Sequence, residues 1–444
     1  MNMNINPLMN QMNIMLSNSI RENINEFNPI INMMNQNIMN QNMINQNINQ
    51  NNMNQNLMKQ NMMNQNGGMN QNMINQNAIN KNQNMVMPKN INNQNNIRPT
   101  QTKLEDLGDT SYLNSVLQLL GSFKEFAKFF LKKENQDSIT DNIKQQPLSF
   151  VIYRLFFHLY PEEERHEIYK PDSLLEVLGL LNKVYKSRNS RNPNDLISFI
   201  LNTLHKELIK KQNIKNEVKN INISNKDEVI KSGVKDFMNY NRSLISEVLN
   251  WFEIKQSKCT NCNTLRYYFY TFNTFELDIL ETYKNKKSNL TVNDCLIYFG
   301  KEKVKKLFCQ KCNHYTETLD CSKIFTGPNI FIFSLNRGDF KNPENELVNI
   351  PFYIEENINL SAIIERKHQL IINYELTGIV SGFKKNNKWL FGSFCKSPYD
   401  QNWYYYFNDK NIQELSLNDI LEKHNNNNNF IPCILVYKLI PCKK

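Results

Sequence analysis

Long apolar runs are absent from this sequence. No stretch of about eighteen consecutive apolar residues occurs in it, which argues against a membrane-spanning helix. The first residues also contain no apolar segment of the length that a secretory signal peptide has. These two absences predict an intracellular protein, cytoplasmic or nuclear, that has no membrane partner.

A dense block of basic residues is also missing. The formal net charge is +10 at pH 7, but the lysines and arginines are scattered, and no cluster of them is interleaved with aromatic residues. Such a cluster would be the electrostatic footprint of a nucleic-acid-binding surface. We therefore predict no nucleic-acid partner.

The first hundred residues lack both cysteine and histidine. They consist almost entirely of Asn, Met, Gln and Ile, in irregular repeats such as Met39–Asn42 and Met63–Asn66. A segment of this composition buries too little apolar surface to offset the entropy lost on ordering. We expect residues 1–100 to be a disordered low-complexity tail. It either promotes self-association, as Asn/Gln-rich tracts can, or has no role.

The rest of the chain has the composition of a globular protein and begins with helix-like patterns. Apolar residues at helical spacing predict helices over about 113–120, 123–130 and 195–208. Residues 209–240 are polar and charged, so we expect a loop-rich insertion there.

Short strand-like runs follow after about Trp251, separated by Asn and Gly residues. They span residues 267–272, 329–335, 376–380, 403–407 and 430–437. Helices first and strands later predict an α+β fold.

The sequence contains nine cysteines. An odd number without a signal peptide argues for a reducing compartment and metal binding rather than a disulfide framework. Four of them form two Cys-x-x-Cys pairs, Cys259 with Cys262 and Cys309 with Cys312. Two such pairs can complete a closed tetrahedral zinc site, which is structural and not catalytic. The alternatives are four unrelated thiols, or a site in which the nearby His314 replaces one cysteine.

Residues 108–118 resemble the nucleophile box of the ubiquitin-specific proteases, which belong to the papain-like cysteine proteases. The segment reads Gly-Asp-Thr-Ser-Tyr-Leu-Asn-Ser-Val-Leu-Gln, where the family has Gly-Asn-Thr-Cys-Tyr-Met-Asn-Ser-Val-Leu-Gln. Further segments resemble the family's other boxes in the same order. They are residues 194–199 with 204–208 (the Asp-Ala-Gln-Glu-Phe-Leu helix), the two Cys-x-x-Cys pairs (the zinc-bearing fingers), 328–337 (the Leu-Lys-Arg strand), 374–380 (the strand before the histidine box), 403–409 (the Trp-Tyr-x-Phe-Asn-Asp segment) and 434–437 (the closing strand).

The resemblance implies a papain-like α+β fold with a thumb of helices, a palm of strands and zinc-tipped fingers. We expect the thumb at about 101–245, the fingers with the zinc site at 246–345 and the palm at 346–444. In this family ubiquitin sits on the fingers and palm, and its C-terminal tail threads the cleft between thumb and palm. The expected partners are therefore ubiquitin or a ubiquitinated protein, together with a multiprotein complex.

The resemblance also assigns a position to each group that cleaves the isopeptide bond. In the family a cysteine attacks, a histidine accepts its proton, an Asp or Asn orients the histidine, and a polar donor holds the oxyanion. Those four positions here hold Ser111, Leu390, Asn408 and Asp109 respectively. A serine hydroxyl depends on a base, which leucine cannot supply, and a carboxylate cannot donate a hydrogen bond to an oxyanion. The catalytic set is therefore predicted to be degenerate.

Other residues do not restore the set. No histidine occurs between His368 and His424, so a shifted alignment supplies no base. His368 precedes the strand, and His424 is expected in an Asn-rich loop. Cys395 and Cys433 are candidate replacement nucleophiles, but both lie in strand-like apolar runs and are interpreted as buried structural thiols.

Three functions follow from this pattern. The first is an inactive member of the family that binds ubiquitin or a ubiquitin-like protein without cleaving it. The second is a scaffold or adaptor in a larger complex, without ubiquitin binding, as in an inactive member of pre-mRNA splicing; the extra zinc domain of that member has no counterpart in residues 1–100. The third is a weakly active deubiquitinase. Pro193 and Asp195 stand where the family has acidic residues, which implies altered contacts to the ubiquitin tail.

Overall fold

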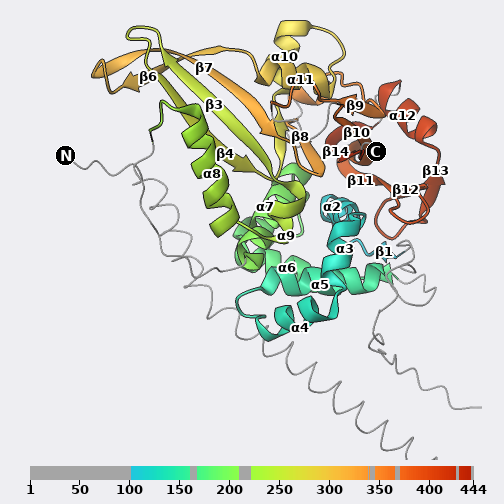
Figure 1. The fold of residues 1–444 in the computed structure, drawn as a ribbon. Helices are drawn as coiled ribbons and strands as arrows, with labels where there is room; N and C mark the ends of the chain where they lie inside the picture. Colours follow the sequence, from blue (N-terminus) through green and yellow to red (C-terminus); the bar gives the residue numbers. More distant parts are fainter. Residues whose placement is uncertain are drawn as a thin grey trace, which may run out of the picture. The chain divides into compact units, whose positions relative to one another are not determined.

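The computed structural model describes residues 102–160, 168–209, 222–338, 340, 346–365, 371–426 and 430–441, all within one compact unit (Figure 1). Residues 1–100 lie outside the described ranges, so the disorder of this tail stays a prediction. Within the described ranges, no helix has both the length and the apolar character needed to cross a membrane.

The N-terminal part of the described chain is helical. The helices are α2 (Ser111–Gly121), α3 (Lys124–Phe130), α4 (Lys133–Asp141), α5 (Pro147–Leu159), α6 (Asp172–Leu181), the 3-10 helix η1 (Lys183–Tyr185), α7 (Pro193–Leu208), α8 (Lys226–Tyr240) and α9 (Leu244–Leu249). The helices predicted from apolar spacing are confirmed, because they coincide with α2, α3 and α7. Two short strands, β1 (Lys103–Leu104) and β2 (Ile168–Tyr169), pair in parallel beside them.

Helix α8 corrects the prediction of a loop-rich insertion, since only residues 210–221 of that stretch lie outside the described ranges. Its periodicity is weak because just two of its side chains are buried, those of Val229 and Phe237. The helix begins where the Asn225 side chain accepts hydrogen bonds from two backbone amides of the first turn. Gly233 then allows close packing on Phe269, because a Cβ at that position would lie only 2.3 Å from the phenylalanine ring. Capping and one close contact, rather than an apolar stripe, define this element.

The C-terminal part forms an eight-stranded sheet. Its strands are β5 (Phe275–Leu277), β8 (Ile330–Leu335), β9 (Asn357–Asn359), β10 (Asn373–Lys385), β11 (Lys388–Lys396), β12 (Trp403–Tyr406), β13 (Gln413–Leu415) and β14 (Ile431–Leu439). The order is β13-β12-β11-β10-β14-β8-β5, and β9 pairs with the start of β10. The pairing of β5 with β8 is parallel and the other pairings are antiparallel. The strands predicted at 329–335, 376–380, 403–407 and 430–437 all fall in this sheet, so those predictions are confirmed.

A tight turn connects β10 to β11. Lys385 pairs with Lys388, and the two residues between them, Asn386 and Asn387, have φ angles of 50° and 60°. Two successive left-handed residues are the mark of the type I′ turn, whose twist suits a hairpin. Because asparagine tolerates this conformation, the turn fixes the register of β11 and with it the position of Leu390.

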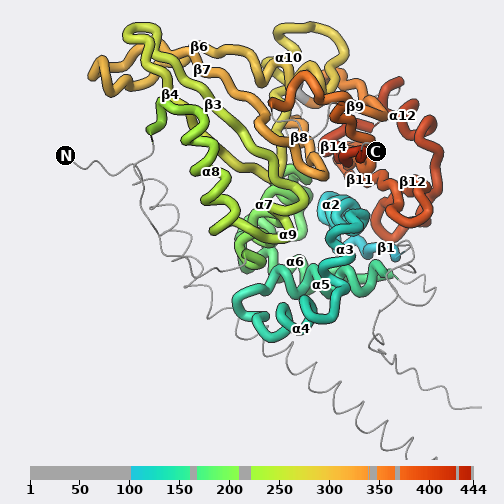
Figure 2. The backbone as a smooth tube through the Cα atoms, viewed as in Figure 1, coloured from blue at the N-terminus to red at the C-terminus, as the bar shows by residue number. Residues whose placement is uncertain are grey.

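A separate four-stranded antiparallel sheet has the order β4-β3-β7-β6. Its strands are β3 (Trp251–Cys259), β4 (Leu265–Phe272), β6 (Lys303–Cys309) and β7 (His314–Thr326). Figure 2 shows these strands extending together away from the eight-stranded sheet, with β6 and β7 reaching the far tip. The remaining helices are α10 (Ile279–Lys286), α11 (Val292–Phe299), the 3-10 helix η2 (Glu346–Asn349) and α12 (Leu417–Asn425).

Trp251 lies where the two sheets meet. Its ring is 4.6 Å from that of Phe275, at the start of β5, and 5.0 Å from that of Phe272, at the end of β4. Phe299 at the end of α11 meets it edge-on, and the indole N–H donates to the Thr274 carbonyl. A single core cluster runs from this tryptophan through β8, β10 and β14. The two sheets are therefore joined by a shared apolar core.

Among the described elements, helix α2 is a central one, because it contacts both other helices and the eight-stranded sheet. All eleven of its residues are buried, and it packs against α7 on one side and against β10 and β11 on the other. Gly378 of β10 permits this approach, because a Cβ there would lie 2.4 Å from Leu119. The N-terminus of α2, which carries Ser111, is thereby held against the sheet.

Candidate functional site

Ser111 is the first residue of α2 and is only 1% exposed. The loop before it turns through two left-handed residues, Gly108 at φ 95° and Asp109 at φ 44°. Asp106 holds this loop, because its carboxylate accepts hydrogen bonds from the Gly108 amide and from the Thr110 hydroxyl. The serine is thus placed by a short, internally hydrogen-bonded turn.

The hydroxyl of Ser111 contacts strand β11. The backbone N–H of Phe391 donates to Ser111 Oγ over 3.1 Å. Phe391 directly follows Leu390, whose side chain is half-buried and which pairs with Phe383 of β10. The structure therefore brings together Ser111 and the backbone beside Leu390, two positions 280 residues apart in sequence.

Each of the four histidines in the described ranges has partners away from Ser111. His158 stacks on Tyr169, His205 Nδ1 bonds the Ser243 hydroxyl, and His314 Nδ1 bonds the Cys312 carbonyl. His424 contacts Ser381, as described below. His368, one of the two histidines considered in place of a catalytic base, lies outside the described residues.

His424 lies in the last turn of α12, which corrects its predicted place in a loop. Its Nε2 is 2.7 Å from the Ser381 hydroxyl, and its Nδ1 is 2.7 Å from the Ile420 carbonyl. Because a carbonyl only accepts, Nδ1 carries the proton and Nε2 accepts from the serine. Burial lowers the pKa of this imidazole to about 4. The ring is therefore neutral, and both its nitrogens are engaged.

Asn408 connects helix α2 to the loop that precedes it. Its side-chain N–H₂ donates to Asp106 Oδ2 over 2.9 Å, and its Oδ1 accepts from Asn114 Nδ2 over 3.0 Å. The residue adopts a left-handed φ of 48°, which asparagine tolerates. In this arrangement both ends of the amide are used to hold the start of α2. Asp106 and Asn114 are site residues that sequence reasoning missed, because only the folded chain brings them to Asn408.

Asp109 points to the β10–β11 hairpin. Its carboxylate lies 3.3 Å from the ammonium of Lys388, and both side chains are largely exposed. An exposed pair of this kind contributes little stability, about 0 to 1 kcal/mol. Its geometric effect is to connect the loop before Ser111 with the strand that carries Leu390.

Cys395 and Cys433 are buried in β11 and β14. Burial raises the pKa of each thiol to about 12. A nucleophilic cysteine needs the opposite, an accessible thiol with a lowered pKa. Their geometry therefore agrees with the interpretation of structural thiols.

The start of α7 packs on the end of β8. Its helix begins with Asn192 accepting from the Asn194 amide and with Pro193 in the first turn. Asn194 Nδ2 donates to the Leu335 carbonyl over 2.8 Å, while the neighbouring Asp195 is exposed. This contact joins the helix that resembles the family's Asp-Ala-Gln-Glu box to the strand that resembles its Leu-Lys-Arg box.

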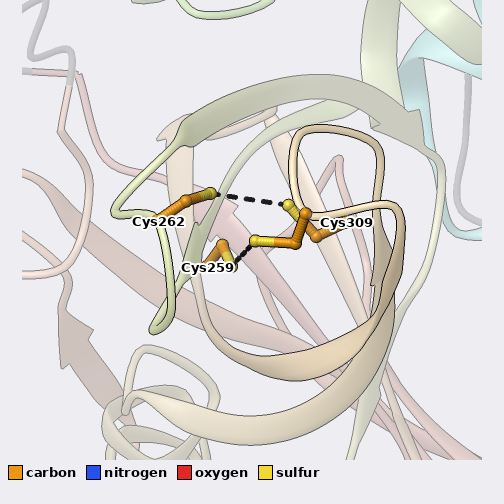
Figure 3. Close-up of side chains that lie close together, drawn as sticks. Cys259, Cys262 and Cys309 are labelled. Carbon is orange, nitrogen blue, oxygen red and sulfur yellow. Dashed lines mark hydrogen bonds between the residues drawn. The ribbon is translucent and has the colours of Figure 1, made fainter.

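The four cysteines of the two Cys-x-x-Cys pairs converge at the tip of the four-stranded sheet. Their sulfur atoms all lie within 4.8 Å of one another, and the Cys259–Cys312 and Cys262–Cys309 pairs are 3.9 Å and 3.6 Å apart (Figure 3). Four sulfurs at about 2.3 Å from one zinc ion are about 3.8 Å from each other in a tetrahedron. The prediction that the two pairs meet is confirmed, and this set could hold a zinc ion. His314 is exposed and bonds a carbonyl instead.

Both cysteine pairs use the same turn, which ends in an asparagine that sequence reasoning missed. Asn263 and Asn313 directly follow the second cysteine of each pair and have φ angles of 54° and 57°. Their amides donate to the carbonyls of Cys259 and Cys309, which closes each knuckle. The repeated pattern Cys-x-x-Cys-Asn was the available signal, because asparagine is favoured among non-glycine residues at left-handed positions.

Hydrogen bonds and crowding act in opposite directions on these thiols. The Thr316 hydroxyl, 3.2 Å from the sulfur of Cys259, lowers the pKa of that thiol to about 6. Burial, followed by the neighbouring cysteines, raises the pKa of Cys312 to about 12. Four thiolates this close repel one another unless a cation lies between them. The donor set is thus suited to a divalent metal with a preference for sulfur.

A family model and the sequences of curated proteins both relate this chain to ubiquitin carboxyl-terminal hydrolases. The family model "Ubiquitin carboxyl-terminal hydrolase" matches residues 102–437. Ubiquitin carboxyl-terminal hydrolase 4 of Saccharomyces cerevisiae is 22% identical over 344 residues, which cover 69% of this chain and 36% of that protein. The protein of the same name from Arabidopsis thaliana is 22% identical over 312 residues, which cover 65% of this chain and 82% of that protein. The chain thus spans about a third of the yeast relative's length.

Solved structures show the same fold. The SAGA Ubp8/Sgf11/Sus1/Sgf73 DUB module bound to ubiquitin aldehyde aligns with a TM-score of 0.54 at 18% identity, over 77% of this chain and 70% of that one. The same module with a point variant of Ubp8, bound to monoubiquitin, aligns with the same TM-score at 19% identity. Since the family model covers most of the chain, the chain belongs to the ubiquitin carboxyl-terminal hydrolase family and has the papain-like α+β fold of the ubiquitin-specific proteases.

Proposed function

We propose that this chain is a catalytically degenerate ubiquitin-specific-protease-like protein that binds ubiquitin or a ubiquitin-like protein without cleaving it. One observation carries the proposal: the Ser111 hydroxyl at the head of α2 faces the backbone of β11 beside Leu390, and no histidine of the described ranges hydrogen-bonds it. A serine attacks an acyl group only when a base takes its proton. An aliphatic side chain at position 390 cannot do this.

The surroundings of Ser111 support the same proposal. The side-chain amide of Asn408 donates to Asp106 and accepts from Asn114, so both its ends are engaged by residues other than an imidazole. Asp109 offers a carboxylate, paired with Lys388, where an oxyanion would need a hydrogen-bond donor. Loss of a single triad member costs on the order of 10⁴- to 10⁶-fold in rate. We therefore propose that the positions of Ser111, Leu390, Asn408 and Asp109 form an inactive remnant.

Binding of ubiquitin is proposed from the retained scaffold. Two of the structural neighbours are DUB modules with ubiquitin aldehyde or monoubiquitin bound, and each contains Ubp8 together with Sgf11, Sus1 and Sgf73. By this likeness we propose ubiquitin or a ubiquitinated protein as a partner, together with a multiprotein complex. The three proposed subdomains are a thumb at about 101–245, fingers at 246–345 and a palm at 346–444.

A structural zinc ion is also part of the proposal. Cys259, Cys262, Cys309 and Cys312 would hold it at the tip of the four-stranded sheet, where it would supply folding free energy. Thiolate ligands persist in reducing compartments, which agrees with a cytoplasmic or nuclear location.

Two alternatives lead to different measurements. A scaffold without ubiquitin binding is favoured by Pro193 and Asp195 at the head of α7, which stand where the family has acidic residues and so change the surface that the family offers to the ubiquitin tail. A weakly active deubiquitinase would use Ser111 as its nucleophile.

Calorimetric titration of mono-ubiquitin into the zinc-loaded full chain separates the first alternative from the proposal: we expect saturable binding at about micromolar affinity. Absence of heat from a folded, zinc-loaded protein would favour the scaffold.

Hydrolysis of a fluorogenic ubiquitin substrate separates the second alternative. We expect the wild type and Ser111→Ala to release fluorophore at the same background rate. A double variant, Ser111→Cys with Leu390→His, should exceed that background by at least about a hundredfold, because it restores two triad members. Ser111→Ala with Leu390→His is the matched control. A wild-type rate that falls in Ser111→Ala would instead establish residual activity.

A further inference from the structure

Strand β6 forms an exposed outer edge of the four-stranded sheet. It pairs with β7 on one side, and no strand of the described ranges pairs with it on the other. Large apolar side chains are exposed along it: Val304 is 65% exposed and Phe308 is 46% exposed, and Tyr315, the partner of Phe308 on β7, is 65% exposed. The rings of Phe308 and Tyr315 lie 5.6 Å apart in an edge-to-face contact. An unpaired strand with such side chains is a template for another strand.

The same edge is basic. Lys303, Lys305 and Lys306 lie within β6, and successive side chains point to opposite faces, so both faces of the edge carry ammonium groups. Nearby carboxylates neutralise only part of this charge: on β7, Glu317 lies opposite Lys306, and Asp320 lies opposite Lys303. Asp320 is 2.8 Å from Lys255 in the neighbouring β3 and 3.9 Å from Lys305. The edge therefore combines apolar contacts with an excess of positive charge.

A hollow adjoins this edge on one face of the sheet. It has a volume of about 320 Å³. Its walls include four lysines, two carboxylates and three aromatic rings: Lys255, Lys301, Lys303, Lys305, Glu253, Asp320, Tyr270, Phe272 and Phe299. A hollow of this size accommodates one or two side chains. Because its four lysines outnumber its two carboxylates, the hollow favours an acidic group, and its rings favour an apolar stem.

We propose that β6 binds an acidic, extended segment of a partner protein, which adds to the sheet as a fifth strand. The main-chain groups of β6 would supply the hydrogen bonds, as in other cases of strand addition. Alternate side chains of the bound segment would meet Val304 and Phe308 on one face and the lysine-lined hollow on the other. Their carboxylates would pair with Lys303, Lys305 and Lys306.

Charge selects this occupant over two others. A second copy of β6 would bring the same three lysines against the edge, and like charges at close range cost binding free energy. The chain's own residues 1–100 contain five basic and two acidic residues, so they carry the same sign. An acidic segment is the occupant that the edge attracts.

The cysteine cluster fixes the edge in place. Cys309 is the last residue of β6, and its sulfur lies 3.6 Å from that of Cys262 on the other hairpin. A metal held by these cysteines would therefore stiffen the strand that receives the partner. A rigid edge lowers the entropy lost when a flexible segment binds.

The test uses the zinc-loaded full chain and a fluorescent peptide of about eight residues that alternates glutamate and valine, the length of a typical strand. Fluorescence anisotropy should show saturable binding that weakens with added salt. Charge reversal of the edge by Lys305→Glu with Lys306→Glu should weaken binding at least about tenfold. The matched control, Lys231→Glu with Lys235→Glu, changes two exposed lysines of α8 by the same charge and should leave binding unchanged.

Further probes identify the mode of binding. The same peptide with every amide N-methylated should not bind, and residues 303–309 should be protected from hydrogen–deuterium exchange only with the unmodified peptide. Equal binding of the N-methylated peptide or of a lysine–valine peptide would overturn the proposal, as would an unaffected charge-reversal variant or no binding at all. Sedimentation that shows dimers dissociated by the reversal would assign the edge to a second copy instead. Displacement by mono-ubiquitin would assign it to the ubiquitin site, whereas peptide binding that persists beside ubiquitin supports a separate surface.

Discussion

At the scale of single residues, the protein contains two serines whose hydroxyls meet very different partners. Ser111 heads the central helix and receives a hydrogen bond from the Phe391 backbone, while Ser381 bonds the imidazole of His424 at 2.7 Å. The second pair has the composition of a nucleophile and its base, but Ser381 is fully buried and His424 nearly so. A pair closed off from substrate acts as a fixed internal contact.

The buried His424 leads to a prediction about pH. Its pKa falls from 6.5 in the unfolded chain to about 4 in the folded one, because burial disfavours the charged ring. Below pH 6.5 the unfolded chain binds a proton that the folded chain does not, so stability is lost as the pH falls from 6.5 towards 4. At pH 5 the loss from this one group should be about 2 kcal/mol relative to pH 7.5. Urea unfolding at the two pH values measures it.

Two histidine variants complete that experiment. His424→Gln removes the titrating group and should reduce the loss between pH 7.5 and pH 5 by about 2 kcal/mol, whatever its effect on stability at pH 7.5. The control His314→Gln makes the same replacement at an exposed histidine. If the His424 variant and the wild type lost the same free energy, His424 would not be buried and neutral as described.

Sequence alone located some of these residues and not others. Ser111 and Asn408 could be found because they lie in contiguous runs that resemble family motifs. Asp106 could not, since its role depends on hydrogen bonds to a loop nearby and to Asn408, 302 residues away. The helical position of His424 was also missed, because α12 ends at Asn425, within the Asn-rich run, and that composition indicated a loop. Residues whose role depends on distant contacts leave no local pattern.

At the scale of elements, the two cysteine hairpins show what short patterns can and cannot predict. The spacing of the cysteines indicated the metal site, and the sulfur distances agree with it. The α8 helix shows the opposite case, because two buried side chains in fifteen residues give no usable periodicity. The Asn225 cap and the acidic residues of the first turn, Asp227 and Glu228, are signals of a helix start. A search for such signals, rather than for an apolar face, would have predicted this helix.

Metal removal should affect the four-stranded sheet first. We expect the purified chain to contain about one zinc per molecule by mass spectrometry of the metal, and a strong chelator to lower its melting temperature. Cys262→Ala should lose the zinc, because three thiolates leave the tetrahedral set incomplete. The control Cys321→Ala changes a β7 cysteine that bonds the Gly300 carbonyl, outside the cluster, and should keep the zinc. Equal zinc content in both variants would count against the four-cysteine site.

At the scale of the whole molecule, the order of the strands is the feature that sequence did not predict. Strand β14 lies between β10 and β8, and β8 lies between β14 and β5, so several neighbours in the sheet come from distant parts of the chain. These pairings depend on which apolar faces meet in the core. The residue pattern within a single strand does not indicate which other strand it will pair with. The α+β class, by contrast, depends only on the sequence of element types, which the patterns did contain.

The shared core at Trp251 predicts how the molecule loses stability. Trp251→Ala would remove the contacts to Phe272, Phe275 and Phe299 and should cost about 3 to 5 kcal/mol in the free energy of unfolding. Because these contacts join the two sheets, we expect the unfolding transition monitored by circular dichroism to broaden or divide. Trp389→Ala, at a half-buried tryptophan of β11, is the control and should cost clearly less. Similar losses from both variants would mean that Trp251 does not join the sheets.

The wide separation of the two cysteine pairs has a consequence for the newly made chain. Cys309 follows Cys262 by 47 residues, and ribosomes add about 5 to 20 residues per second. The first cysteine pair therefore leaves the ribosome about 2 to 9 seconds before the second pair. During that interval two thiols are exposed to oxidants and to chaperones, and a metal ion bound by them alone would be held loosely. The metal site at the tip of the four-stranded sheet can therefore be completed only after Cys312 has emerged.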